Sequence, residues 1–524
     1  MRCPLTLQHL VARVRRSNAP VRRVLAERLN DPTVLVLLVA LFQVVIWGGL
    51  SGFLAVAPPD DSLEQVLLSQ ELRLEYGKHP PLPTWILYAT NQIFGASIGA
   101  TYVLGALCSV ATLLLLYAWA RTLIGARRAA LAAMLLSNVE YMNAGTAYFN
   151  HNTVQLPLAL LAIVLFHRAL TRMRWLDWAI FGAGCGLMML AKFSAVVLFA
   201  SFAVYLIWTR RMSEVSVWRG LVIAAVAGVS VITPYLVAVH GDSWAPNAYA
   251  MQAIFPEDVT RIQRLETVWR FASSQVAKVA PALLLFAVLR RGAPRPAPAA
   301  GQAIALGPFL TLIGFGPFVL TVVIAALTGA YLLVGWGTTF HVLLTFWLVA
   351  ARPFAIEAPQ RALRRAAFAS IALQIALWAF MMANGGRLPN LNSTPRHTPP
   401  PTPTTLAEVV RRTWTEHCAA PLRFVVTDVH TGAALAVRFG GQPRVVDGSR
   451  PEFAKLFPDD ARAAHGAVVV LQRPPVNASP RLPMDELIAA AVWRSRVELS
   501  SKDGQRREYF LGVLQPLTGG GCDH

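Results

Sequence analysis

Apolar residues run in long stretches through the first 385 residues of the chain, and short polar segments separate them. Stretches of about 17–25 apolar residues are long enough to cross the roughly 30 Å hydrocarbon core of a bilayer as helices. The pattern predicts a polytopic helical membrane protein with about eleven spans. The expected spans lie near residues 34–56, 95–120, 129–146, 153–170, 176–191, 194–209, 217–237, 276–290, 304–328, 331–350 and 366–384.

The pattern changes after Met382. Residues 386–404 are rich in Pro, Thr, Asn and Arg, which is typical of an extended linker. Residues 405–524 combine short β-like runs with helical patterns, and about 120 residues are enough for a separate core. We therefore predict an all-α polytopic membrane bundle over residues 33–385, followed by a small α/β domain. The β-like runs are 422–426 and 467–471, and the helical patterns are 405–418 and 484–494.

Composition and charge agree with a membrane protein. Only 14% of the residues are charged and 55% are hydrophobic, whereas an ordinary soluble domain has about 25% charged residues. The net charge of +19 comes mostly from Arg and Lys in short segments beside apolar runs, as the positive-inside rule describes, so we do not expect nucleic-acid binding. Residues 1–32 are a basic segment that we expect to be cytoplasmic, without a cleavable signal peptide. An odd number of spans then puts the C-terminal α/β domain on the extracytoplasmic side.

The sequence predicts its chemistry to lie in the outer loops. It contains no Walker loop, dinucleotide-binding glycine fingerprint, HExxH or zinc-spaced cysteine pairs, so no cluster requires a metal, and metal dependence stays open. Cys108 and Cys185 fall within apolar runs and are most simply core residues. Cys418 and Cys522 fall in the external domain, where oxidising conditions permit a disulfide, but the distance between them is not predicted. The expected outer loops are residues 58–94, 146–153 and 238–275.

The first outer loop carries the densest set of reactive side chains. Asp60, Asp61 and Glu64 follow the first span, and Lys78 and His79 precede a proline pair. Carboxylates at the mouth of a membrane span are costly to place there and rarely serve packing. A carboxylate on an interfacial helix can accept a proton from an incoming hydroxyl, and cations on the same loop can neutralise a departing phosphate. The combination suggests a reaction centre at the membrane surface.

A structural interpretation of the same loop also stays open. Asp60 and Asp61 are common helix-capping residues, and Asp61 with Glu64 fits a capping pattern. They would cap a helix over residues 62–74, and the proline pair would end it. Taken singly, each residue has this ordinary explanation.

The order of residues resembles a motif of the GT-C superfamily of membrane glycosyltransferases. This superfamily includes protein O-mannosyltransferases, aminoarabinose transferases of lipid A and lipopolysaccharide sugar transferases. The first loop has Asp-x-x-Glu-Gln at 61–65, Gly-x-x-Pro-Pro-Leu-Pro-Thr-Trp at 77–85 and Phe-Gly at 94–95. Further similarities lie at residues 148–152, 186–194 and 335–338.

The resemblance implies inverting transfer of a sugar from a polyprenyl-phosphate donor to an envelope glycan, lipid or protein acceptor. It also implies a reaction at the outer face of the bacterial inner membrane, with the polyprenyl-phosphate sugar as donor substrate and with a need for a divalent metal left open. The family's general base corresponds to Asp61, and an alternative register makes Asp60 the base. Lipid phosphate is a good leaving group, so one carboxylate suffices, whereas hydrolytic inverting enzymes need a second carboxylic acid.

The resemblance also implies a donor-binding set, with some departures from the family pattern. Many relatives have an acid in the second loop, where this chain has Asn152 beside His151. Asn152 can bind a hydroxyl but cannot act as a base. Lys192, between two predicted spans, either contacts the donor phosphate or extends to the interface as long basic side chains do. The expected donor-binding residues are Glu64, Lys78, His79, His151, Asn152 and Lys192.

Two other classes of function stay open at this stage. A transporter or flippase of a lipid-linked substrate would also be polytopic and carry charges within the membrane. Such proteins often show inverted repeats and helices broken near the membrane centre, whereas this sequence shows no convincing internal repeat. A non-catalytic relative acting as a scaffold is the second alternative, and the asparagine at position 152 is its main support.

Overall fold

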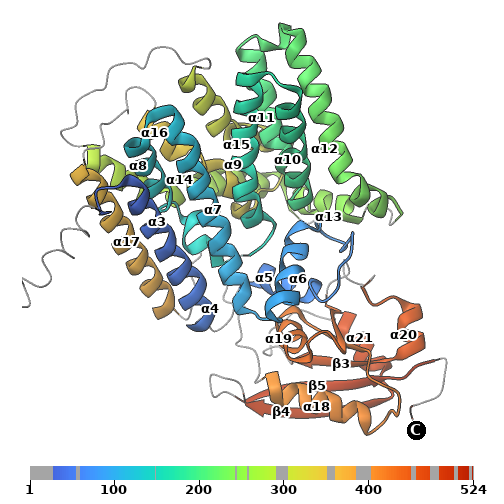
Figure 1. Cartoon of the computed structure of the whole chain (residues 1–524). Helices are drawn as coiled ribbons and strands as arrows, with labels where there is room; N and C mark the ends of the chain where they lie inside the picture. The colour runs from blue at the N-terminus through green and yellow to red at the C-terminus, as the bar shows by residue number, and fades with distance from the viewer. Residues whose placement is uncertain are drawn as a thin grey trace, which may run out of the picture.

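The chain has a large helical part and a C-terminal α/β part (Figure 1). The computed structural model describes residues 28–54, 59–147, 149–241, 245–256, 259–290, 305–350, 360–384, 403–449, 456–472, 483–500, 506–517 and 522. Nearly all of the predicted basic segment and of the predicted linker lies outside these residues. The expected fold class, a helical membrane bundle with a small α/β domain, is confirmed.

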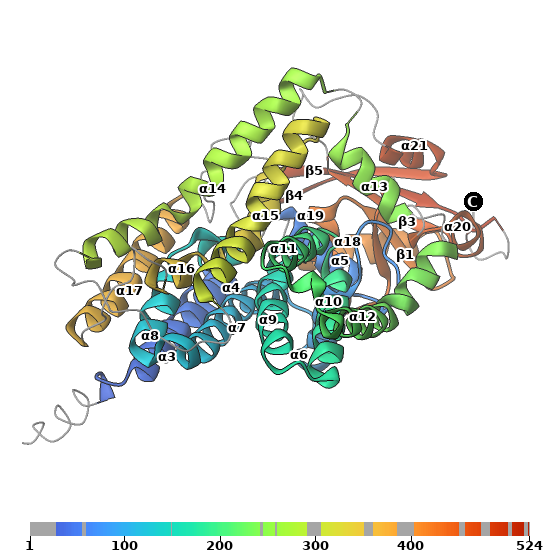
Figure 2. The ribbon, with the colours of Figure 1, turned by 90° about the horizontal axis from the view of Figure 1, so that it is seen from above.

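Seven helical segments of the described part are long and apolar enough to cross a membrane, and three apolar segments are shorter. The number of spans therefore stays a prediction. The long segments are α3 (Pro32–Gln43) continued by η1 (Val44–Leu50) and α4 (Ser51–Leu54), α7 (Gly99–Ile124), α9 (His151–Arg172), α12 (Val215–Gly241), α14 (Arg261–Arg290), α15 (Leu306–Thr328) and α17 (Gln360–Ala383). The shorter ones are α10 (Trp175–Ala191), α11 (Ala195–Trp208) and η5 (Val334–His341) continued by α16 (Leu344–Ala350). Seen from above, α3, α7, α8 (Ala126–Leu136), α16 and α17 form one group, and α9 to α12 form another (Figure 2).

The segment predicted to span the membrane at residues 129–146 is not one helix. Helix α8 (Ala126–Leu136) ends early, and two 3₁₀ turns follow it, η2 (Glu140–Met142) and η3 (Ala144–Ala147). The side chains of Ser137 and Asn138 donate to the carbonyl of Met134, and Asn143 donates to the carbonyl of Ser137. Such local bonds compete with the helical ladder, which explains why the helix stops here.

The helix of the first outer loop is also shorter than expected. Helix α5 (Asp60–Leu68) begins two residues before the predicted start, and the residue that precedes it is Pro59, which has no side-chain group for capping. Asp60 and Asp61 therefore lie in the first turn, where the helix dipole favours carboxylates, and do not act as N-caps. The helix ends before Gln70, whose side-chain amide pairs with the backbone carbonyl and N–H of Val445. Helix α6 (Leu82–Phe94) follows the proline pair.

Helices α10 and α12 pack backbone to backbone. A Cβ atom on Gly182 would lie 2.0 Å from the carbonyl oxygen of Ala224, and one on Gly186 would lie 2.7 Å from that of Gly228. Only glycine permits this approach. The close packing brings the end of α10 to a defined place beside the first outer loop.

The C-terminal part is a five-stranded sheet covered by helices on both faces. Strand β1 pairs in parallel with β2 and β3, while β5 pairs antiparallel with β3 and β4, in the order β2-β1-β3-β5-β4. Val425, Val468 and Leu511 pack on one face with α18 and α19, and Val426 and Val469 pack on the other with α21. The strands are β1 (Phe424–Thr427), β2 (Arg444–Asp447), β3 (Ala467–Gln472), β4 (Trp493–Ser500) and β5 (Arg506–Leu514). The helices are α18 (Pro403–Thr415), α19 (Val429–Phe439), α20 (Asp459–His465) and α21 (Pro483–Ala490).

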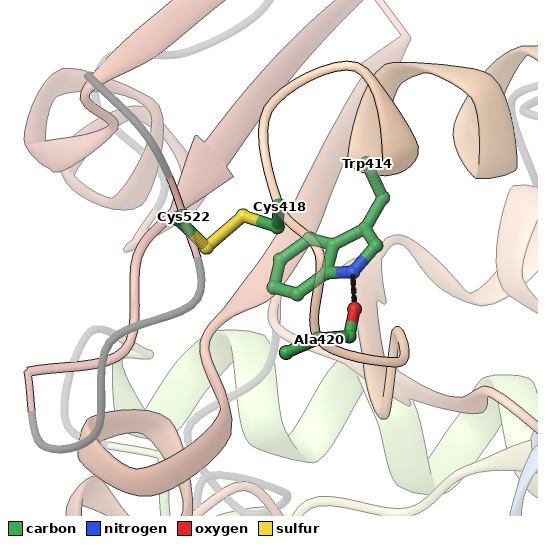
Figure 3. The surroundings of a disulfide bond; sticks show 4 residues. All are labelled: Trp414, Cys418, Ala420 and Cys522. Carbon is green, nitrogen blue, oxygen red and sulfur yellow. Dashed lines mark hydrogen bonds between the residues drawn. A yellow bond between two sulfur atoms is a disulfide. The ribbon is translucent and has the colours of Figure 1, made fainter.

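A disulfide joins Cys418 to Cys522, the pairing that the sequence left open (Figure 3). The two cysteines are 104 residues apart in the sequence. Beside the disulfide, Trp414 at the end of α18 donates its indole N–H to the carbonyl oxygen of Ala420. The bond therefore fastens the end of the chain to the segment that follows α18.

Candidate functional site

One cavity of about 580 Å³ collects nearly all the predicted site residues. It lies between α5, the loop before α6, the start of α9, the α10–α11 connection, α13 (Ala245–Ile254) and η5. Its polar lining residues include Asp61, Glu64, Lys78, His79, Asn150, His151, Asn152 and Lys192. Its apolar lining residues include Ala253, Ile254, Ile324, Ala325, Leu332 and Leu333.

The two candidate bases of α5 have different surroundings. Asp61 is exposed toward the cavity and shares a face of the helix with Glu64, three residues later. The side-chain amide of Asn150 donates a hydrogen bond of 2.8 Å to the Asp61 carboxylate. Asp60 is not among the described residues that line the cavity, and its carboxylate lies 3.2 Å from Nε2 of His430 in the C-terminal part. The geometry therefore brings Asp61, and not Asp60, to the site.

Lys78 already has a carboxylate partner. Its Nζ lies 2.9 Å from Oε2 of Glu64, and both side chains are largely buried, at 10% and 4% exposure. Its ammonium also lies 5.2 Å from the ring centre of Tyr249. Burial alone would lower the pKa of Lys78, but the carboxylates of Glu64 and Asp61 outweigh it and raise that pKa above its ordinary value. Lys78 is thus a permanent cation whose charge Glu64 largely balances.

Lys192 occupies the break between α10 and α11. The backbone is extended there, and the Lys192 carbonyl accepts a hydrogen bond of 2.8 Å from Gln155. The ammonium donates to Oδ1 of Asn152 at 2.6 Å and lies 5.8 Å from the ring centre of Trp336. Burial lowers the pKa of Lys192 to about 8, although Asp61 acts in the opposite direction. Lys192 is therefore a cation at neutral pH whose hydrogen-bond partner is a neutral amide.

The two histidines of the site lie against each other. The ring centres of His79 and His151 are 4.3 Å apart, and those of His79 and Tyr249 are 5.4 Å apart in a T-shaped arrangement. Burial, together with His151 and the two lysines, lowers the pKa of His79 well below its ordinary value. A neutral His79 would offer a phosphate an N–H hydrogen bond and no charge.

Three further residues of the site were not among the predicted ones. Asn150 is the N-cap of α9, where its Oδ1 accepts the backbone N–H groups of Asn152 and Thr153. An asparagine just before an apolar helix is a recognisable capping signal, so this position was predictable. Tyr249 and Trp336 reach the cavity from segments distant in sequence, and their roles depend on the tertiary fold.

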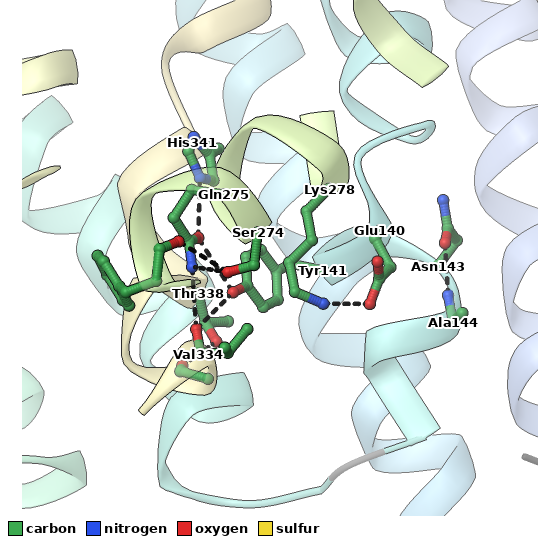
Figure 4. A network of polar contacts seen from close by, with 12 residues as sticks. Glu140, Tyr141, Asn143, Ala144, Ser274, Gln275, Lys278, Val334, Thr338 and His341 are labelled. Carbon is green, nitrogen blue, oxygen red and sulfur yellow. Dashed lines mark hydrogen bonds and ion pairs between the residues drawn. The ribbon is translucent and has the colours of Figure 1, made fainter. Parts of the chain in front are cut away.

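A polar network holds η5, the segment that carries Trp336 (Figure 4). The hydroxyl of Tyr141 donates to the carbonyl of Val334 at 2.8 Å, and the amide of Gln275 donates to the same oxygen at 3.0 Å. Oε1 of Gln275 also accepts a hydrogen bond of 3.1 Å from the Tyr141 hydroxyl and lies 3.1 Å from Nε2 of His341. This network fixes the backbone two residues before Trp336.

An ion pair between Lys278 and Glu140 lies beside this network (Figure 4). It connects α14 to the 3₁₀ turn η2, and the Lys278 ammonium also lies 4.8 Å from the ring centre of Tyr141. Charged residues within a membrane part are costly and tend to be paired, as they are here.

A second, apolar cavity of about 500 Å³ adjoins the first. It lies between α10, α11 and α12, and Phe193 and Val196 line both cavities. In the described part of the chain, no group of three or more His, Cys, Asp or Glu residues could hold a metal ion.

Comparisons with known proteins agree with the resemblance seen in the sequence. The family model for dolichyl-phosphate-mannose-protein mannosyltransferase matches residues 78–237. The chain is 30% identical over 181 residues to the undecaprenyl phosphate-alpha-4-amino-4-deoxy-L-arabinose arabinosyl transferase 2 of Pseudomonas fluorescens. It is 29% identical over 190 residues to the lipopolysaccharide core galacturonosyltransferase RgtA of Rhizobium johnstonii. These matches cover 33% and 35% of this chain, but only 31% and 37% of the two curated relatives.

The fold extends the similarity to almost the whole chain. The structure of ArnT from Cupriavidus metallidurans bound to undecaprenyl phosphate matches with a TM-score of 0.58 at 15% identity, over 93% of this chain and 99% of that one. The same protein in the apo state matches with a TM-score of 0.50 over the same shares. At this identity the match shows a shared fold.

Proposed function

Because the chain belongs to the GT-C superfamily of membrane glycosyltransferases, we propose that it transfers a sugar from a polyprenyl-phosphate donor to an acceptor of the bacterial envelope. The acceptor would be a glycan, a lipid or a protein. The observation that carries the proposal is one cavity that combines an accessible carboxylate, Asp61, with the ammonium of Lys192 and an adjoining apolar cavity. Two relatives named for sugar transfer, one for an undecaprenyl-phosphate sugar and one for the lipopolysaccharide core, support it.

In this proposal Asp61 is the general base. Its carboxylate takes the proton of the acceptor hydroxyl as the oxygen attacks the anomeric carbon. The bond from that carbon to the phosphate oxygen breaks on the opposite side, so the configuration inverts and polyprenyl phosphate leaves. Asn150 supports the role because its hydrogen bond holds one Asp61 oxygen, while the cavity leaves the carboxylate accessible.

Lys192 is the proposed principal cation for the donor phosphate. Its partner Asn152 is neutral, so a phosphate oxygen can replace or join that hydrogen bond without breaking an ion pair. Lys78 contributes less because Glu64 balances its charge. His79 and His151 complete the phosphate side as hydrogen-bonding groups.

The apolar cavity suits the polyprenyl chain. It lies between α10, α11 and α12 and meets the polar site at Phe193 and Val196. A donor with its phosphate at Lys192 would therefore have an apolar path for its first isoprenoid units. Burying apolar chain in such a cavity contributes about 25 cal/mol for each Å² removed from water.

We also propose that the site opens to the extracytoplasmic face. His151 at the start of α9 lines the cavity, whereas Arg168 and Arg172 lie near the other end of the same helix. Lys192 lines the cavity just before α11 begins, and Arg210 and Arg211 follow the other end of that helix. Basic residues favour the cytoplasmic side, so the cavity would lie at the opposite side, with the C-terminal α/β domain.

The alternatives of a flippase and of a scaffold are less well supported. The relatives are named as transferases, and the polar residues gather at one end of the helices. A flippase would need a polar path through the bilayer. A scaffold would not need an accessible carboxylate facing a cation across a cavity.

The test uses membranes that contain the wild type, Asp61→Asn or Asp60→Asn, supplied with labelled polyprenyl-phosphate sugars and an envelope extract. We expect transfer by the wild type, a loss of about 10²- to 10⁴-fold in Asp61→Asn, and measurable transfer by Asp60→Asn. Glu214→Gln, a change of an exposed carboxylate outside the cavity, is the matched control and should behave as wild type.

Each contrary result has a definite meaning. Full transfer by both aspartate variants would refute the general base, and loss only in Asp60→Asn would assign the role to that residue. Movement of labelled lipid across vesicles without transfer would favour the flippase, and a wild type with neither activity would favour the scaffold.

A further inference from the structure

Helix α5 is in contact with two parts of the protein. One side faces the cavity with Asp61 and Glu64, and another lies against α19 and β2 of the C-terminal domain (Figure 1). Leu63 and Leu67 belong to the same buried cluster as Val429 and Ala433 of α19. The helix that carries the proposed base is therefore partly built into the C-terminal core.

Polar contacts also join the end of α5 to the C-terminal domain. The side-chain amide of Gln70, just after α5, donates to the carbonyl of Val445 at 2.8 Å and accepts from its N–H at 3.0 Å. It thereby pairs with the edge strand β2 as a neighbouring strand would. Arg444 lies 2.6 Å from the carboxylate of Glu71. These contacts fix the end of α5 against the sheet.

The start of α5 is fixed in three directions by three consecutive residues. The Asp60 carboxylate contacts His430 at 3.2 Å. Asp61 accepts a hydrogen bond from Asn150 at the start of α9. Ser62 donates to the carbonyl of Ala147 at 3.2 Å and accepts the N–H of Phe149 at 2.9 Å, which attaches it to the segment before α9.

The backbone around His430 is itself held in place. Asp428 is the N-cap of α19 and accepts the backbone N–H groups of His430 and Thr431 at 2.9 and 3.0 Å. Gly432, in the same turn, allows close packing, since a Cβ there would lie 3.1 Å from a methyl group of Leu67. The first turn of α19 therefore contacts α5 through both a polar and an apolar group.

We infer that His430 is a positioning residue of the transfer reaction, and that it acts through Asp60 to hold the first turn of α5 with Asp61 aimed at the acceptor hydroxyl. The inference rests on the proposed function. It gives the C-terminal domain a part in catalysis and gives Asp60 an anchoring role. Positioning errors of about 1 Å can cost about a hundredfold in rate, so a contact one residue from the base is well placed to matter.

The test compares His430→Ala with His465→Ala, an exposed histidine of the same domain. We expect His430→Ala to lower kcat by about 10- to 100-fold while the donor KM stays within about twofold, because the Lys192 side of the cavity is unchanged. His465→Ala should match the wild type. Combining His430→Ala with Asp60→Asn should lower kcat no further than the stronger single variant, as expected for residues that act through one contact.

A second measurement does not depend on activity. Hydrogen exchange of residues 60–68 should become faster in His430→Ala than in the wild type and in His465→Ala, because the first turn of α5 loses a partner. Gln70→Ala, which removes the contact at the other end of α5, should have the same effects and serves if His430→Ala does not fold.

The inference is wrong if the wild type transfers sugar while His430→Ala keeps wild-type kcat and exchange, or if the losses in the double variant are additive. A wild type without transfer would refute the proposed function instead. In that case the exchange of residues 60–68 would still decide whether His430 holds α5.

Discussion

Donor binding should weaken as Lys192 loses its proton. Burial lowers the pKa of Lys192 to about 8, so about nine-tenths of the side chain is charged at pH 7 and about one-tenth at pH 9. The charged form is the one that attracts phosphate, so affinity is present below this pKa and lost above it. If the charge is required for binding, the donor KM should rise about tenfold between pH 7 and pH 9.

The assay is the initial rate of transfer against donor concentration, in nanodiscs, from pH 6.5 to pH 9.5. Lys192→Arg provides the matched comparison, because a guanidinium stays protonated throughout, with a pKa above about 12. Its donor KM should stay flat over the range in which that of the wild type rises. Lys192→Gln should bind donor weakly at every pH.

Other groups near Lys192 make the arginine variant essential. Asp61, Lys78, His79 and His151 all face the same cavity, and a change in their charge would also affect donor binding. A donor KM equal at pH 7 and pH 9 in the wild type would refute the reasoning. So would an equal rise in Lys192→Arg, since the titrating group would then lie elsewhere.

Three further predictions concern the Trp336 contact, the packing of α10 against α12, and the disulfide of the C-terminal domain. Trp336→Leu removes a cation–π contact worth about 0.5–2 kcal/mol, so we expect a higher donor KM and a rise that begins at lower pH; an unchanged pH profile would contradict the contact. Gly182→Val would place side-chain atoms against the Ala224 carbonyl and should reduce folded protein in size-exclusion chromatography, whereas Gly307→Ala, in open space, should not. Cys418→Ser should destabilise the C-terminal domain by about 2–5 kcal/mol, measured as a lower thermal midpoint that matches reduced wild type.

The apolar runs predicted most helices because a helix in a membrane needs apolar residues along most of its length. The runs at 153–170, 194–209 and 304–328 correspond to α9, α11 and α15 within a few residues. The run at 129–146 did not, because Ser137 and Asn143 bond the local backbone and stop the helix. Hydropathy alone does not include this competition.

The residues that line the site were easier to predict from the sequence than the side chains with which they form ion pairs. The order of residues in the first outer loop singled out Asp61, Glu64, Lys78 and His79, all of which line the cavity, and also Asp60, which does not. The different surroundings of Asp60 and Asp61 were not predictable, because the partner of Asp60, His430, is distant in the sequence and meets α5 only in the tertiary fold. The balancing of Lys78 by Glu64 likewise depends on a loop conformation.

The Asn150 side chain accepts hydrogen bonds from α9 and donates one to Asp61, and this restricts which residues can occupy position 150. Its oxygen accepts two backbone N–H groups of α9, so the amide cannot rotate by half a turn, and its nitrogen must face Asp61. Aspartate, serine and threonine would cap α9 about as well, but a carboxylate would repel Asp61 and the hydroxyls are too short to span both contacts. The hydrogen bond to Asp61, and not the capping of α9, is therefore what distinguishes asparagine from the other capping residues at this position.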